Sequence, residues 1–315
     1  MNYTLVLDSS AALPEFLIKK RPIKILPMTV RINDDEFPDI VDERKLIDLY
    51  ESGKISTTAN IDAISPSQDL ISDFILHQVV PEYDFAICQT LAKTVSPIYD
   101  NLSGAANQIS GKAREARESM GIEQPFRMTY MSTGTTVAGQ GLLGIYADIM
   151  LSKGMDYSQY KTQIEKFKQV AKGYLVVKDM VYARHRAKMR GVKTVALPVA
   201  VIGKLVGLSP IALNHNETLN VVAMPTSYEK SANKLFQFAK DRIKEGLYFN
   251  AVNVTIAGNP TDLEAFSGFI ALREAAEKAQ IKLLVGVMSL AASINCGPGA
   301  IGLGIAPKNL KKEPG

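Results

Sequence analysis

Short apolar runs alternate with longer amphipathic segments through the first half of the chain. The runs predict buried strands at Leu5–Leu7, Tyr83–Gln89 and Arg127–Met131, because short continuous apolar stretches between turn residues are typical of strands in a parallel sheet. Helices are expected at 11–18, from 42 to about 52, at 67–77, at 96–118, after 136, and at about 157–171. Strands that alternate with helices predict an α/β half with a mostly parallel sheet.

Two segments of this half have less regular patterns. Ile23–Ile32 is predicted as a second strand, and Pro27 within it indicates an edge or a bulge, since proline cannot donate a ladder hydrogen bond. Lys54–Pro66 is polar, rich in hydroxyl groups and without periodicity. This composition predicts a loop.

The second half has a different pattern, with a few alternating strands and two long helices. The expected strands and helices, in chain order, are 174–177, 218–224, 227–245, 251–256, 261–279, 281–287 and 300–304. Two strand–helix repeats followed by two strands predict a smaller α+β domain. We place the boundary near Gly173, which gives an α/β domain over 1–172 and a smaller domain over 173–315.

The longest apolar stretch, Thr194–Leu213, is long enough to suit a membrane span. Lys204 lies near its middle and prolines interrupt it, so a buried helix followed by a strand is the favoured interpretation. The first residues lack a basic segment, and Asp8 breaks the apolar run that follows. We therefore expect a cytosolic protein that is not integral to a membrane.

Composition and charge exclude several function classes. Hydrophobic residues make up 46% of the 315 residues and charged residues 22%, which is ordinary for a globular protein and unlike a disordered one. A net charge of +4 gives no indication of nucleic-acid binding. Two cysteines and three scattered histidines lack metal-ligand spacing, and no serine lies in a G-x-S-x-G elbow. No cofactor, metal site or hydrolase site is expected.

The segment Gly139–Gly144 has the spacing G-x-G-x-x-G of a dinucleotide-binding turn. That function requires the first glycine directly after a strand, so that a pyrophosphate reaches the helix N-terminus. Here the preceding strand ends near Met131, and Ser132–Thr136 forms the turn instead. The three glycines are therefore expected inside the helix, where they allow close packing.

Hydroxyl groups and glycines recur just after the predicted strands, at 8–10, 57–58, 94–96, 132–136 and 295–299. The carboxyl ends of strands in an open α/β sheet form the usual ligand crevice, where hydroxyl and backbone N–H groups suit an anion. The same residues also serve as helix caps and turn formers. A basic run at Arg184–Arg190 is either a solvated helical face or a docking patch for an acidic partner.

The order of these segments resembles the DegV family, the group that includes the fatty-acid-binding FakB proteins. The resemblance rests on LVLDSSAALPEFL at the start, ILPMTVRIND, STGTTVAGQGLLGIYADIML and the closing NCGPGAIGLG. It spans nearly the whole chain. It implies a larger α/β domain, a smaller domain with an antiparallel sheet, and an apolar tunnel between them that holds one fatty acyl chain. It also implies a non-catalytic carrier that presents the carboxylate to a separate kinase.

The resemblance points to individual ligand-binding candidates, at which the family's residue type is sometimes retained and sometimes changed. Thr57 and Thr58 match a hydroxyl-bearing loop that contacts the carboxylate, and Ser132 matches a strand-end serine. Ala92 stands where the family has a serine, while Ser96 keeps a later position of the same motif. The two remaining candidates are matched weakly or changed: Arg186 retains a base, and Asn295 replaces a histidine.

These departures leave three hypotheses. Alanine cannot donate a hydrogen bond and asparagine cannot carry a charge, so Ala92 and Asn295 indicate an altered head-group site. The leading hypothesis is a carrier of a long-chain fatty acid or related lipid. The alternatives are a nucleotide-dependent enzyme that uses the Gly139–Gly144 helix, and an interaction protein that has lost its ligand.

Overall fold

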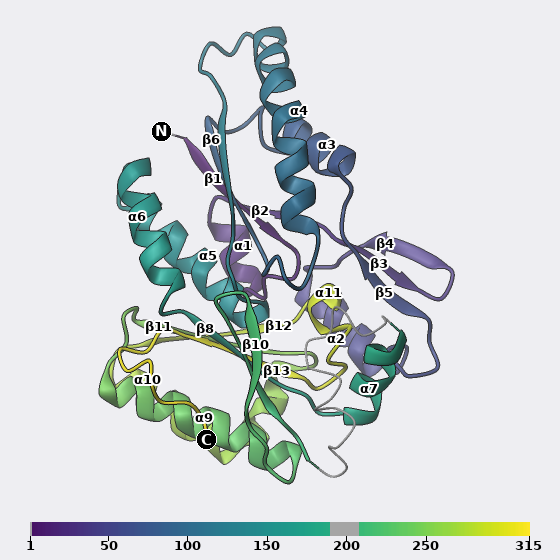
Figure 1. Cartoon of the computed structure of the whole chain (residues 1–315), viewed down its shortest axis with the longest axis vertical. Helices are drawn as coiled ribbons and strands as arrows, with labels where there is room; N and C mark the ends of the chain where they lie inside the picture. Colours follow the sequence, from purple (N-terminus) through teal and green to yellow (C-terminus); the bar gives the residue numbers. More distant parts are fainter. Residues whose placement is uncertain (1, 190–207) are drawn as a thin grey trace.

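A four-stranded parallel sheet forms the centre of the first half of the chain (Figure 1). The computed structural model describes residues 2–189 and 208–315. In this sheet the order is β2-β1-β6-β7, with bounds Tyr3–Asp8 for β1, Ile23–Leu26 for β2, Phe85–Thr90 for β6 and Arg127–Ser132 for β7. All three pairings are parallel. The expected α/β half with a parallel sheet is confirmed.

Helices cover both faces of this sheet because its strands are apolar on both sides. One face packs on α3 (Gln68–Gln78) and α4 (Ile98–Ser119) through a buried cluster that includes Val6, Cys88 and Ile75. The other face packs on α1 (Glu15–Lys20), α5 (Val137–Ser152) and α6 (Tyr157–Lys168). Helix α1 begins at Glu15 rather than Ala11, because Pro14 stands at its N-cap and the preceding residues form a loop.

A six-stranded sheet forms the centre of the second half. Its order is β10-β9-β8-β13-β11-β12, and only β11 and β12 pair in parallel. The bounds are Lys172–Val176 for β8, Ile211–His215 for β9, Thr218–Ala223 for β10, Ala251–Ile256 for β11, Lys282–Val287 for β12 and Ile301–Ile305 for β13. The mainly antiparallel sheet that the resemblance implies is therefore present.

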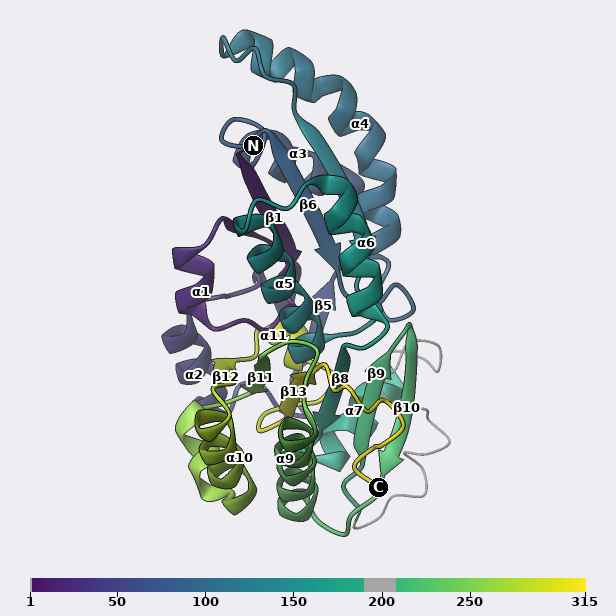
Figure 2. The same ribbon diagram turned by 90° about the vertical axis from the view of Figure 1, so that its left-hand side faces the viewer.

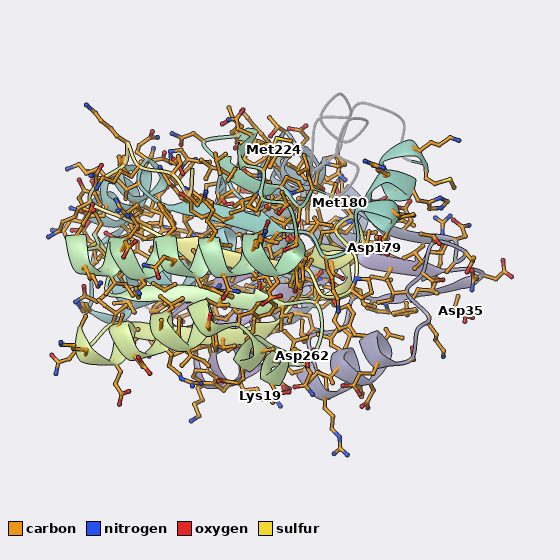
Figure 3. The ribbon with its side chains drawn as sticks, turned by 90° about the horizontal axis from the view of Figure 1, so that it is seen from below. Lys19, Asp35, Asp179, Met180, Met224 and Asp262 are labelled. Atoms are coloured by element: carbon orange, nitrogen blue, oxygen red, sulfur yellow. The ribbon has the colours of Figure 1, made fainter. Side chains whose placement is uncertain are left out.

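Two helices lie side by side on the outer face of this sheet, α9 (Tyr228–Glu245) and α10 (Ser267–Lys278). Figure 3 shows them from below, with Asp262 of the short 3₁₀ helix η1 (Pro260–Ala265) beside them. The single helix predicted for Thr261–Ala279 is thus two elements, because Phe266 takes an extended backbone between them and is buried.

Helix α5 lies between the two sheets and contacts β1, β8, β11 and β13 (Figure 2). The glycines of the G-x-G-x-x-G segment lie inside it, as expected. A Cβ on Gly139 would lie 2.8 Å from Gly173 Cα, and one on Gly141 would lie 2.5 Å from the Ala12 carbonyl oxygen. These glycines allow backbone to approach backbone, and this close packing leaves no open turn for a pyrophosphate.

A small third sheet corrects two expectations. Ile23–Ile32 is not one strand: β2 ends at Leu26, and β3 (Thr29–Ile32) pairs with β4 (Asp35–Pro38) and β5 (Ile61–Ile64). The chain changes sheet at Pro27, which removes a ladder donor. Strand β5 lies in the segment predicted as a loop, and only Ile61 in it is fully buried, so it carries no alternation that a pattern could detect.

The remaining helices of the described residues lie near the junction of the layers. They are α2 (Glu43–Glu51), α7 (Met180–Met189) and the short α11 (Leu290–Ser293). Of these, α11 was not predicted, and α7 was anticipated only as one interpretation of the basic run at Arg184–Arg190. Figure 3 shows Asp179 and Met180 where α7 begins, with Asp35 of β4 at the outer end of the small sheet.

The apolar stretch Thr194–Leu213 lies mostly outside the described residues, and its end forms the start of β9. Within 2–189 and 208–315, no helix combines the length and apolar character needed to cross a bilayer.

Candidate functional site

The loops after β1, β6 and β7 meet at the carboxyl edge of the parallel sheet, where Asp8 connects the first two to helix α5. Asp8 Oδ1 accepts hydrogen bonds from Ser10 N at 3.0 Å and Ser10 Oγ at 2.5 Å. Its Oδ2 accepts from Leu91 N at 2.7 Å and from Gln140 Nε2 of α5 at 2.8 Å. Burial raises the pKa of this carboxyl group. The network fixes the loops after β1 and β6 relative to α5.

A narrow space, which we call the inner cavity, lies beside these loops and between the two sheets. Its volume is about 60 Å³, below the range of roughly 300–1,000 Å³ typical of ligand pockets. Most of its lining is apolar and comes from both halves of the chain, including Leu91, Val95, Val137, Leu175, Ala212, Leu219 and Ala291. The polar groups on its wall include Ser10, Thr136, Asn214 and Asn295.

A wider depression, the outer hollow, adjoins the inner cavity and has a volume of about 440 Å³. The two share part of their walls, namely Ser10, Leu91, Val95, Ala291 and Asn295. The outer hollow also reaches Met28, Ser65, Ser96 and Met189. The two spaces therefore adjoin at a wall that carries both apolar and polar groups, and we call the two together the path.

Three buried polar atoms along this path have no hydrogen-bond partner within the described part of the chain: Asn214 Oδ1, Asn295 Oδ1 and Ser65 Oγ. Buried polar atoms are nearly always hydrogen-bonded, and an unpaired one costs about 1–3 kcal/mol. The amide of Asn295 can rotate to offer either its oxygen or its N–H₂ group. Asn295 can therefore bind a protonated or an ionised carboxyl group, without the charge that a histidine supplies.

The backbone of the cavity wall carries strain at Val137, the first residue of α5. Its φ is +51°, in the left-handed region that β-branched residues rarely adopt. Thr136 and Val137 both line the inner cavity. Strained backbone of this kind persists where surrounding packing fixes it, and it concentrates at binding sites.

Helix α11, which carries Ala291 on the shared wall, is held from beneath by Asp39. The Asp39 carboxylate accepts from Leu290 N at 3.1 Å and from Ala291 N at 3.3 Å. Burial raises its pKa to about 6, although hydrogen bonds from Ser9 and Ser289 oppose that shift. Tyr50 of α2 is a second support, since its hydroxyl lies 2.7 Å from Ser293 Oγ.

The structure brings some of the predicted ligand-binding residues to this path. Ser96 lines the outer hollow, and Asn295 lines both spaces. Ala92 is fully buried beside them, and its N–H donates to the Thr135 carbonyl at 2.8 Å. Arg186 is buried behind the outer hollow, where its Nη2 lies 3.7 Å from Oδ1 of Asp62, a residue of the hollow's wall.

The other predicted residues have different surroundings. Thr57 and Thr58 lie on a partly exposed loop and line neither space, and Thr58 Oγ1 is 3.0 Å from Ser56 Oγ. Ser132 Oγ donates to the Glu217 carboxylate at 2.5 Å rather than pointing to the inner cavity. A ligand-binding role for these three residues stays a prediction.

Several residues of the site were missed because they carry no motif. Asn214, Ser65 and Asp39 lie on β9, before α3 and after β4, far apart in the sequence. Among the missed residues, Gln140 carries a signal in the sequence, because it is a polar residue within an apolar helix. In the structure its side chain has no exposed surface. A polar side chain in such a place indicates a buried partner, here Asp8.

Comparison with known proteins identifies the family. The model of the group described as "Uncharacterised protein, DegV family" matches residues 2–308. The chain belongs to the DegV family. A DegV domain-containing protein of Xanthomonas axonopodis pv. citri is 30% identical over 306 residues, which cover 97% of this chain and 98% of the relative. A second one, from Xanthomonas campestris pv. campestris, is 28% identical with the same coverage.

Solved structures of DegV proteins share this fold. DegV of Bacillus subtilis, described as a fatty acid binding protein, is 15% identical with a TM-score of 0.75, covering 98% of this chain and 100% of its own. A DegV lipid binding protein of Thermotoga maritima is 18% identical with a TM-score of 0.74, covering 98% and 99%. A stearic acid-binding protein of Eubacterium ventriosum is 20% identical with a TM-score of 0.74, covering 97% and 98%.

Proposed function

We propose that this DegV protein is a carrier that holds one long-chain fatty acid, or a related lipid, along the path formed by the inner cavity and the outer hollow. The observation that carries the proposal is an apolar wall with buried amide oxygens at Asn214 and Asn295 that find no hydrogen-bond partner among residues 2–189 and 208–315. An amphiphile meets both requirements, because its chain covers apolar surface and its head group supplies the missing hydrogen bonds. The lipids described for proteins of the same fold support this ligand class.

The head group is assigned to the shared wall, beside Asn295, Ser10 and Ser96. Ala92 leaves one hydrogen-bond donor fewer there than the family motif offers, and asparagine supplies a neutral contact. Each buried methylene contributes about 0.8 kcal/mol, so the acyl chain supplies most of the affinity. We therefore expect weak discrimination between a carboxylic acid and a neutral lipid head group.

The proposed protein transforms nothing by itself and presents the lipid head group to a partner enzyme, such as a fatty acid kinase. The Asp8 carboxylate is the most obvious candidate for a catalytic group near the path. It accepts hydrogen bonds from three residues and is buried behind Ser10. This arrangement supports a structural role for the carboxylate. Within the described residues, no cluster of three His, Cys, Asp or Glu side chains has the geometry to hold a metal ion.

Native mass spectrometry of the purified protein tests the proposal, before and after addition of fatty acids of graded length. We expect one lipid per chain, with loss of uptake in the A292F variant, because Ala292 lines the inner cavity. The N107F variant is the matched control, since Asn107 is exposed on α4. A clean unliganded mass with no uptake of any added lipid contradicts the proposal.

The alternative of an interaction protein without a ligand is favoured by one observation, the small volume of the inner cavity, about 60 Å³. The same measurement distinguishes the two functions. A protein that has lost its ligand takes up no lipid, and its A292F variant behaves like the wild type in every assay.

A further inference from the structure

The turn between β9 and β10 reaches across from the second sheet to the strand-end loops of the first. Its Glu217 side chain accepts from Ser132 Oγ at 2.5 Å and from Thr94 N at 3.4 Å. The backbone also contributes, because Thr94 Oγ1 donates to the Glu217 carbonyl at 2.9 Å and Glu217 N donates to the Gly134 carbonyl at 2.9 Å. One residue of the hairpin thus contacts the loops that follow both β6 and β7.

This contact lies at the rim of the inner cavity. Thr94 is next to Val95, and Glu217 is close to Leu219 and Asn214 along the hairpin; these three neighbours line the cavity from opposite sides. Figure 2 shows the hairpin rising from the second sheet along the side of the molecule toward the first. Opening this contact would separate the cavity walls that Val95 and Leu219 belong to.

The turn has a backbone that its sequence does not favour. Asn216 has φ +48° and Glu217 φ +63°, so both residues are left-handed, as in a type I′ turn. Such turns prefer Asn-Gly, because a side chain at the second position is strained. Asparagine is present at the first position, but the second residue is glutamate. Its side-chain hydrogen bonds to the loops offset the strain, so the turn depends on contact with the first sheet.

The small volume of the inner cavity is the reason why the contact at its rim has to open. The volume of the inner cavity, about 60 Å³, is smaller than that of pockets that hold drug-sized ligands. The part of a long acyl chain that enters the inner cavity therefore requires its walls to move apart. Strained backbone held by exposed or half-exposed hydrogen bonds is the kind of feature that opens at low cost.

We propose that the Asn216–Glu217 turn is a clasp that keeps the cavity closed and must release for lipid to enter or leave. Glu217 is a positioning residue in this mechanism, since it acts through Ser132 and Thr94 and is not assigned to the ligand. The inference rests on the proposed function for the identity of what enters, but the clasp itself is a property of the free protein.

The decisive variant is E217G, which removes the carboxylate and at the same time relieves the left-handed strain. The wild type and the variant are loaded with a fluorescent polyene fatty acid, and its release into excess vesicles is followed by stopped flow. We expect release to be at least about tenfold faster in E217G, while its melting temperature is equal or higher. A merely structural role predicts a stable variant with unchanged release, and release within twofold of the wild type overturns the proposal.

Two further measurements separate this proposal from the proposed function. The control variant Q280G relieves the same strain at Gln280, φ +53°, in the turn before β12, and should leave release unchanged. Hydrogen exchange of the Glu217 amide in the ligand-free protein should speed up in the S132A variant. If the wild type takes up no lipid but this amide responds, the proposed function fails and the clasp stands. If the amide does not respond, the clasp fails.

Discussion

Two of the contacts between the two halves of the molecule differ strongly from each other. The first is buried around α5, where Gly139 packs on Gly173 and Asn253 Nδ2 donates to the carbonyls of Ala12 at 2.8 Å and Ala138 at 3.0 Å. The second is the clasp at Glu217, which is half-exposed and held by hydrogen bonds to hydroxyl and amide groups. The first contact is shielded from water, whereas water can replace the hydrogen-bond partners in the second.

This difference assigns separate roles to the two contacts. Backbone packed on backbone has no small displacement available, because close-packed interiors resist deformation. A hydrogen bond near solvent contributes only about 0.5–1.5 kcal/mol, since water replaces the lost partner. The buried contact therefore acts as the fixed joint about which the rim can open. Because both contacts involve short-range geometry, single substitutions can test each of them separately.

The largest effect is expected at the buried joint, in the G141A variant. A Cβ there would lie 2.5 Å from the Ala12 carbonyl oxygen and 2.7 Å from Asn253 Nδ2, and the backbone atom cannot move aside. We expect a loss of about 3 kcal/mol in the free energy of unfolding, measured by urea denaturation, or failure to fold.

The matched control is G111A on α4, where a Cβ meets nothing within 4 Å. This variant should gain about 0.5–1 kcal/mol, because alanine favours a helix interior over glycine. Equal stability of the two variants would show that the joint is not tightly packed.

An intermediate effect is expected at Asp39, the buried support of α11. Its pKa is about 6 in the folded protein against 3.8 for an unperturbed group, so the folded state binds the extra proton between these values. Stability from this group is therefore highest below pH 4 and is lost as pH rises through 6. The loss is about 3 kcal/mol, at roughly 1.4 kcal/mol per unit of pKa shift.

Urea denaturation of the wild type and the D39N variant at pH 4 and pH 7 checks this expectation. The difference in unfolding free energy should move in favour of the variant by about 3 kcal/mol between the two pH values, because an amide does not titrate. A difference that is the same at both pH values would mean that folding does not raise the pKa of Asp39.

The elements that could be predicted from the sequence are of two kinds. Some are stabilised by residues close in the chain, and others are buried along their whole length. β6 and β11 are buried along their whole length, β6 as a mainly apolar run and β11 with alternating apolar and polar residues, and α9 has a clear polar face and a serine cap. β5 was missed because three of its four side chains are half-exposed. The short α11 was missed because Asp39, distant in the chain, caps it through Leu290 and Ala291.

The same distinction decides which residues of the site could be predicted from the sequence. Ser96 and Asn295 were proposed as ligand-binding residues because each belongs to a local motif, and both line the path, where a binding role stays a prediction; Asn214 and Ser65 join the path only through tertiary packing. Glu217 carried a weak signal that went unused. An Asn-Glu pair between two strands predicts a strained turn, and strain indicates a compensating contact. The identity of its partners, Thr94 and Ser132, depends on how the two sheets face each other.

The smallest effect on stability is expected at the rim, in the T94V variant. It removes the hydrogen bond from Thr94 Oγ1 to the Glu217 carbonyl while keeping the shape of the side chain. We expect the free energy of unfolding to fall by less than about 1 kcal/mol, because the group is exposed and water takes the place of the partner. Lipid release should nevertheless be faster, by about threefold. The matched control is T162V on α6, where an exposed threonine hydroxyl donates to the Ser158 carbonyl at 3.1 Å. If both variants lose the same small stability and only T94V releases lipid faster, the rim controls exchange and the joint controls the fold. If the two release lipid equally fast, the rim hydrogen bonds have no part in exchange.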